Sequence, residues 1–157
     1  LASAMGWKVS VVDPRPVAFT PSERFGAARV VECAHGERLA RAVALTPRTA
    51  AIIMSHNYER DLDYLEVLAS SDVAHIGVLG PRARAERLLR DLDARGRPCP
   101  EAMLERVYGP VGLDLGGDGP EAIALSIVAE LLAVMNGRAG VHLREHAASI
   151  HHAEQSA

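Results

Sequence analysis

Short apolar segments alternate with longer amphipathic segments along most of this chain. Short apolar runs bounded by Pro, Gly or polar residues are typical of buried strands, and longer runs with apolar residues at helical spacing indicate helices. The segments that predict strands are residues 7–12, 27–32, 50–55, 73–79 and 107–108. The segments that predict helices are residues 57–70, 82–95 and 121–135, with a short helix or turn at 37–44. The alternation predicts an α/β fold with helices on both faces of a doubly wound parallel sheet.

The first predicted strand ends at an acidic residue, Asp13, which Arg15 and two prolines follow. In a dinucleotide-binding unit, such an acid lies about 20 residues after a glycine-rich turn and contacts a ribose hydroxyl. Only 12 residues precede Asp13. The sequence therefore predicts a Rossmann-like sheet that lacks its first strand and glycine loop. Asp13 either contacts a ribose or merely ends the strand, and Arg15 either accepts a 2′-phosphate or points outward.

Ligands bind open parallel sheets outside the carboxyl ends of the strands. That rule selects residues 13–15, 55–58, 80–84 and 112–119 as the segments where a site is expected. The candidate cofactor-binding residues are Asp13, Arg15, Ser55, His56, Asn57, Gly77, Gly80, Arg82, Asp114 and Gly116. The sequence predicts no catalytic residue and no metal ligand.

The candidates after the middle strands offer chemistry suited to an anion. His56 either acts as a proton shuttle or hydrogen-bond donor, or it caps the following helix. Gly77 and Gly80 permit the close backbone approach of a ligand or a tight turn. Arg82 and Arg84 lie beside a helix N-terminus, where they predict a phosphate site unless they belong only to a solvated charged helix.

The loop at residues 112–119 precedes the longest predicted helix and is a second candidate anion site. Asp114 would repel a phosphate there unless it binds a hydroxyl, an amino group or a cation. Loop geometry alone would also account for Gly116 and its neighbours. Asp61 receives a structural interpretation, because an acid in the first turn of a helix favours the helix dipole.

Composition narrows the possible partners. The 157-residue chain has a formal net charge of −3 and 4% aromatic residues, whereas nucleic-acid-binding domains usually show a basic excess and stacking aromatics. The most apolar stretch, residues 123–134, contains Glu130 and is too short to span a bilayer. Cys33 and Cys99 form no disulfide scaffold and no CxxC site. With no signal-peptide pattern at the start, we expect a cytoplasmic protein that binds neither nucleic acid nor membrane.

Four ordered motifs resemble the carboxy-terminal Rossmann domain of the XdhC/CoxI family, the accessory proteins of xanthine dehydrogenase and related molybdenum hydroxylases. They are VVDPRP at residues 11–16, SHNYERD at 55–61, IGVLGPR at 76–82, and PVGLDLG at 110–116 followed by PEAIA at 120–124. Two small departures are Ser55, where the family often has Thr, and a more glycine-rich loop before the Pro-Glu pair.

The resemblance implies an accessory factor, or chaperone, that helps deliver the sulfurated molybdenum cofactor to an apo xanthine dehydrogenase-type enzyme. On this interpretation, residues 1–138 form an N-terminally truncated Rossmann domain, and residues 139–157 form a polar, His-rich tail that we expect to fray. The domain would hold the phosphorylated pterin, molybdopterin, at the carboxyl ends of its strands. Such a binding protein needs no catalytic group, so an enzyme is the less favoured interpretation.

Two other functions remain open. One is an NAD(P)-dependent oxidoreductase in which Asp13 contacts the ribose and His56 or Tyr58 donates a proton. The other is a docking domain that recruits a cysteine desulfurase or the apoenzyme and binds no small molecule. A sheet edge left unpaired by a missing strand also predicts a homodimer. His142 and His146 are spaced to bind a metal, but no Cys or carboxylate completes the set, which favours adventitious binding.

Overall fold

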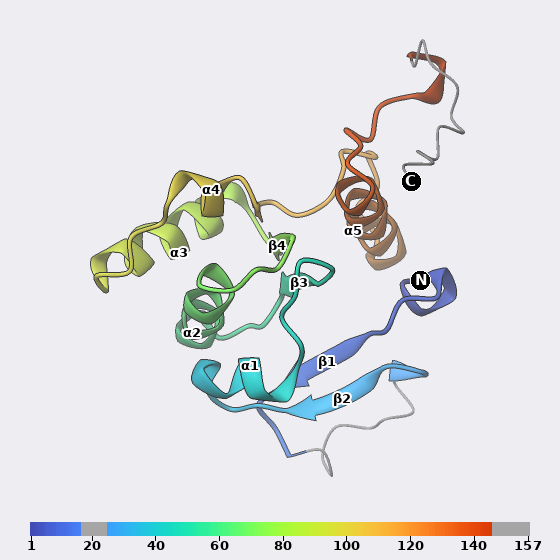
Figure 1. The fold of residues 1–157 in the computed structure, drawn as a ribbon. Coiled ribbons are helices and arrows are strands. Elements are labelled where there is room, and N and C mark those ends of the chain that lie inside the picture. Colours follow the sequence, from blue (N-terminus) through green and yellow to red (C-terminus); the bar gives the residue numbers. More distant parts are fainter. Residues whose placement is uncertain (17–24, 146–157) are drawn as a thin grey trace, which may run out of the picture.

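A computed structural model describes residues 1–16 and 25–145 of the chain (Figure 1). The strands are β1 (Ser10–Asp13), β2 (Arg29–Glu32), β3 (Ala50–Ile53), β4 (His75–Val78) and β5 (Val107–Tyr108). The helices are α1 (Leu39–Ala42), α2 (Tyr58–Ala69), α3 (Arg82–Ala94), α4 (Glu101–Leu104) and α5 (Pro120–Met135). Single 3₁₀ turns are η1 (Ser3–Met5), η4 (Gly36–Arg38) and η5 (Leu143–Glu145). Within the described ranges, no helix is both long enough and apolar enough to cross a membrane.

Local sequence signals set the ends of the main helices. Asn57 caps α2 by accepting a hydrogen bond from the Arg60 amide at 3.0 Å, which satisfies a backbone donor that the helix itself cannot use. Gly96 follows α3 with a φ of 73°, and Pro120 begins α5 at a position where its missing N–H costs no hydrogen bond. These helices agree with the predicted ones to within a residue or so.

All strand pairs in the described structure are parallel, which confirms the predicted α/β class with parallel strands. They form two sheets, β1-β2 and β3-β4-β5, rather than one. Val11 pairs with Val30 in the first sheet, and Ile52 pairs with Gly77 in the second. Among the described residues, β1 pairs only with β2, and β3 pairs only with β4. This arrangement is consistent with a Rossmann-like fold that lacks a strand.

Helices cover the second sheet on both faces. Ile53 of β3 faces a core formed with α2 and α3, in which Leu65 and Leu88 are fully buried. The preceding residue of the strand, Ile52, faces the opposite way, toward Ile127 of α5. Figure 1 shows the same layers, with α2 and α3 on one side of β3 and β4 and α5 on the other.

The two sheets lie between the same two layers. Val12 of β1 packs against the core beneath α2 and α3. Trp7, just before β1, packs against the α5 cluster together with Ala50 and Ile52 of β3. Because both sheets contribute to both cores, they form two parts of one layer. In each sheet, the inner edge is the edge turned toward the other sheet, and β1 and β3 provide these unpaired edges.

The last part of the chain differs from the sheet region. Between α5 and residue 145, where the described part of the chain ends, the only element is the turn η5. Most of the predicted His-rich tail, including His146, lies outside the described residues. The four-residue helix α4 was not predicted, because a single turn begun by Pro100 is too short to show helical periodicity.

Candidate functional site

The carboxyl ends of β3 and β4 carry a buried carboxylate, Asp61, around which the candidate site is built. Asp61 lies in the first turn of α2, and its side chain is only 1% exposed. One carboxylate oxygen accepts a hydrogen bond from the Ser55 hydroxyl, in the loop after β3. The other accepts from Nη2 of Arg84, in the first turn of α3, at 2.5 Å. One buried acid thus joins the starts of two helices and the end of a strand.

The loop after β3 is further fixed by its own hydrogen bonds. The Asn57 amide donates to the Ser55 hydroxyl at 3.1 Å, and Nη2 of Arg84 also donates to the Ser55 carbonyl at 3.3 Å. His56 lies between these two anchored residues and is exposed. The helix cap is the Asn57 side chain, so the alternative that His56 caps the helix is wrong. His56 is instead exposed to solvent on a loop that the hydrogen bonds of Ser55 and Asn57 fix.

Arg84 packs over Gly80, a glycine two residues after the end of β4. Gly80 has a φ of 115°, which side-chain-bearing residues rarely adopt. A Cβ at Gly80 would lie 3.1 Å from Cδ of Arg84, so the aliphatic part of Arg84 runs across the bare glycine. Arg82 is exposed, and the described structure gives its side chain no hydrogen bond or ion pair. The arginine that the fold positions is therefore Arg84.

Tyr58 lies next to this network but is turned toward α3. Its hydroxyl donates to Asp91 at 2.7 Å, and the guanidinium carbon of Arg87 lies 4.4 Å from the ring centroid. Burial, followed by the hydrogen bond to Asp91, raises the pKa of Tyr58 above its ordinary value. A phenol that already donates to a carboxylate and holds its proton more tightly is poorly suited to protonate a substrate. This geometry weakens the oxidoreductase hypothesis.

Asp13 and Arg15 engage each other at the end of β1. Both carboxylate oxygens of Asp13 accept hydrogen bonds from Arg15, at 2.7 Å and 2.9 Å. These hydrogen bonds hold the pKa of Asp13 below its ordinary value. The Asp13 side chain is 14% exposed and that of Arg15 is 64% exposed. A ribose hydroxyl would have to share Asp13 with the arginine that was predicted to accept a 2′-phosphate.

The remaining glycine and loop candidates lie apart from the network. Gly77 is buried inside β4, where a Cβ would meet Val111 and Ile52, so packing explains this glycine. Asp114 and Gly116 are exposed in the loop before α5. In the described part of the chain, no hydrogen bond or ion pair links that loop to Asp61 or its partners. The structure therefore brings together Ser55, Asn57 and Arg84. Gly80 contributes by having no side chain where Arg84 passes.

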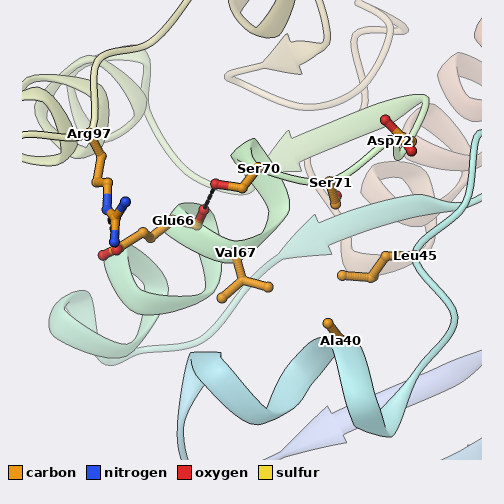
Figure 2. A pocket seen from close by; sticks show the side chains of 8 residues that line it. All are labelled: Ala40, Leu45, Glu66, Val67, Ser70, Ser71, Asp72 and Arg97. Carbon is orange, nitrogen blue, oxygen red and sulfur yellow. Dashed lines mark hydrogen bonds and ion pairs between the residues drawn. The ribbon is translucent and has the colours of Figure 1, made fainter.

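A hollow in the described structure lies at the opposite end of the strands. It has a volume of about 460 Å³ and is lined by α1, the last turns of α2 and Arg97 (Figure 2). The Arg97 guanidinium closes one side through a 3.0 Å ion pair with Glu66. Because α2 runs antiparallel to the strands, its last turns lie at their amino ends, away from the expected ligand edge. We therefore place the candidate site at the Asp61 network.

The thiols contribute nothing reactive to this site. Cys33 follows β2 and is 2% exposed, with its Sγ directed toward the His35 carbonyl. Burial raises the pKa of the Cys99 thiol, which disfavours the nucleophilic thiolate. Within residues 1–16 and 25–145, no three His, Cys, Asp or Glu side chains gather closely enough to hold a metal ion.

Comparison with known proteins agrees with the four sequence motifs at residues 11–16, 55–61, 76–82 and 110–124. The family described as "XdhC Rossmann domain" matches residues 1–131. The chain belongs to this family. It is 36% identical over 132 residues to a probable xanthine dehydrogenase subunit of Bacillus subtilis (strain 168), covering 84% of this chain and 37% of that protein. It is 29% identical over 150 residues to the uncharacterized protein YqeB of Escherichia coli (strain K12), covering 88% of this chain and 25% of that protein.

A solved structure is also similar. The crystal structure of a xanthine dehydrogenase from Bacillus halodurans superposes with a TM-score of 0.71 at 31% identity, covering 87% of this chain and 38% of that one. The family resemblance and the Rossmann-like fold are thus confirmed. The XdhC domain described here spans between a quarter and two fifths of the length of these relatives.

Two residues at the centre of the network were given lesser roles by the sequence. Asp61 was interpreted as a helix-dipole residue, and Arg84 was secondary to Arg82. The available signal was spacing: Asp61 lies six residues after Ser55, and Arg84 lies four after Gly80. Spacing alone does not show that a carboxylate and a guanidinium 23 residues apart will meet.

Proposed function

We propose that this XdhC domain serves an accessory factor for a xanthine dehydrogenase-type molybdenum hydroxylase by holding a phosphorylated pterin, molybdopterin, at the carboxyl ends of its strands. Two observations support the class of function: the family match over residues 1–131 and the xanthine dehydrogenase names of two relatives. The observation that supports a phosphorylated ligand is the half-buried Arg84, which is held in the first turn of α3. On this proposal the partner is the apo form of the hydroxylase.

The residues present fit the phosphate end of such a cofactor. A guanidinium can donate two parallel hydrogen bonds to phosphate oxygens, and a helix N-terminus favours an anion. The first two amides of α3, those of Arg82 and Ala83, accompany Arg84, whose own amide is used by the Pro81 carbonyl at 2.8 Å. The exposed His56 imidazole adds a polar group from the neighbouring loop.

The residues do not offer a ligand for molybdenum itself. Cys33 is buried in the core and Cys99 follows α3, and their sulfur atoms are directed to the carbonyls of His35 and Leu89 rather than to Arg84 or Asp61. The pterin complex would supply the metal and its sulfur, while this chain would bind and orient the phosphate. Release to the apoenzyme would then require only exchange of hydrogen bonds.

The proposal is tested by mass spectrometry of small molecules released on denaturing the protein, purified from a host that makes the molybdenum cofactor. We expect molybdopterin in near-stoichiometric amount. NAD(P) without pterin would overturn the proposal in favour of the oxidoreductase. Release of neither compound would also overturn it, and would leave a docking domain whose strand-end loops contact a protein partner.

A further inference from the structure

Asp61 is a buried charge whose two partners come from different elements, the loop after β3 and the first turn of α3. The Ser55 hydroxyl and the Arg84 guanidinium each donate to one of its oxygens. Taking a carboxylate out of water is costly unless such partners satisfy it. An acid that only favoured the helix dipole could do so from the surface, so the dipole does not account for the burial of Asp61.

Arg84 is held at both ends of its side chain. Its Cδ would lie 3.1 Å from a Cβ at Gly80, so the absence of a side chain at Gly80 leaves room for the aliphatic part of Arg84. Its Nη2 carries every side-chain hydrogen bond that the described structure gives it, to Asp61 and to the Ser55 carbonyl. Nε and Nη1 of a side chain that is 27% exposed are left to bind something else.

We propose that Asp61 is a positioning residue that aims the guanidinium of Arg84 at a phosphate group bound at the strand ends. This inference rests on the proposed function and names its anchoring cation as Arg84 rather than Arg82. A planar guanidinium fixed through one nitrogen presents its other N–H groups in a constant direction, which lowers the entropy lost when an anion binds. Asp61 offsets part of the charge of Arg84, while the start of α3 keeps the edge attractive to phosphate.

The experiment titrates the protein with inorganic pyrophosphate by calorimetry and compares single variants. We expect Arg84→Ala to weaken binding by about tenfold or more, because a charge-assisted hydrogen bond is lost. Arg84→Lys should also bind weakly, because an ammonium keeps the charge without the planar fork. Arg90→Ala, an exposed charge farther along α3, is the matched control and should leave the dissociation constant within twofold. A larger effect from Arg82→Ala than from Arg84→Ala would overturn the inference.

The role of Asp61 is separated from simple stability by a second pair of variants. Ser55→Ala removes one donor to Asp61, whereas Ser55→Thr keeps the hydroxyl. We expect Ser55→Ala and Asp61→Asn to weaken pyrophosphate binding severalfold, and Ser55→Thr to restore it. If Asp61→Asn and Ser55→Ala lower the unfolding temperature while the dissociation constant stays at the wild-type value, Asp61 is merely structural and the inference is wrong.

The two proposals fail separately. If molybdopterin is absent from the purified protein but pyrophosphate binding depends on Asp61 and Arg84, the pterin proposal fails and the positioning role stands. If molybdopterin is present and the Arg84→Ala protein retains it in full, the accessory function stands and the positioning role fails. Absence of pyrophosphate binding by the wild-type protein would also overturn the positioning role.

Discussion

Gly77 shows how a single residue in this fold is fixed by its neighbours. A Cβ at this position would lie 2.5 Å from Cγ2 of Val111 and 2.7 Å from Cδ1 of Ile52. Both contacts are shorter than packed carbon atoms allow, so α5 and the loop before it can approach β4 only because residue 77 has no side chain. The sequence left two roles open for this glycine, the close approach of a ligand or a tight turn, whereas the structure fills that space with protein.

Replacing Gly77 with Ala is therefore expected to lower the free energy of unfolding by about 1–3 kcal/mol, the usual cost of overpacking a core. Urea unfolding followed by circular dichroism measures the change. The matched control is the double variant Gly77→Ala with Val111→Ala, which removes the methyl group that clashes. The double variant should lose less stability than the sum of the two single changes. Strict additivity would show that the clash is relieved by some other movement.

Helix α5 is joined to the sheet through a buried polar pair. His75 of β4 is fully buried, stacks on Tyr108 of β5 at 4.2 Å between ring centroids, and its Nε2 lies 2.9 Å from Glu130 of α5. Its other ring nitrogen, Nδ1, has no hydrogen-bond partner in the described structure. Burial lowers the pKa of His75 below its ordinary 6.5, although Glu130 acts in the opposite direction. The imidazole is therefore neutral in the folded protein near pH 7.

A lowered histidine pKa makes the stability of the protein depend on pH. Below pH 6.5, the unfolded chain takes up a proton at His75 before the folded chain does. The contribution to stability is therefore fully present above pH 6.5 and is lost as the pH falls through the lowered folded pKa. We expect the free energy of unfolding, measured by urea titration, to fall between pH 7 and about pH 5. His75→Gln cannot titrate and should flatten this part of the profile, and an unchanged slope would contradict the assignment.

At the scale of elements, local patterns located the long helices and the buried strands. The α2 boundaries follow from Asn57 and the apolar spacing of Leu62, Leu65 and Leu68, all of which are local. The same patterns missed α4, whose single turn has no measurable period. The division of the strands into two sheets was not predicted either, because partner choice depends on contacts distant in sequence.

At the scale of the whole molecule, the inner edges of the two sheets carry unpaired backbone groups. Val9 and Asp13 accept hydrogen bonds from β2 and its continuation, so the alternate residues of β1, including Val12, turn their N–H and C=O groups the other way. The same alternation applies to β3. The Ile53 carbonyl accepts a hydrogen bond from the Leu79 amide of the β4 segment, so the backbone N–H and C=O groups of Ile52 point toward the unpaired edge. Unpaired edges of this kind favour pairing with another strand.

We therefore expect the 157-residue chain to self-associate as its concentration rises. Size-exclusion chromatography with light scattering over a dilution series measures the molar mass. Ser10→Lys places a charge at the edge of β1, a usual way to discourage edge pairing, and should shift the equilibrium toward monomer. A constant monomer mass of 16.8 kDa at every concentration would contradict edge pairing.

The sequence by itself determined the parallel α/β class, the positions of α2, α3 and α5, and the strand ends where Ser55, Asn57 and Gly80 lie. These features follow from hydrophobic periodicity, caps and chain breaks, which act over a few residues. Only the tertiary structure decided that Asp61 meets Arg84, because a salt bridge across 23 residues depends on how two helices start from neighbouring parallel strands. Register and crossover geometry are collective properties of the packed chain, so no local pattern encodes them.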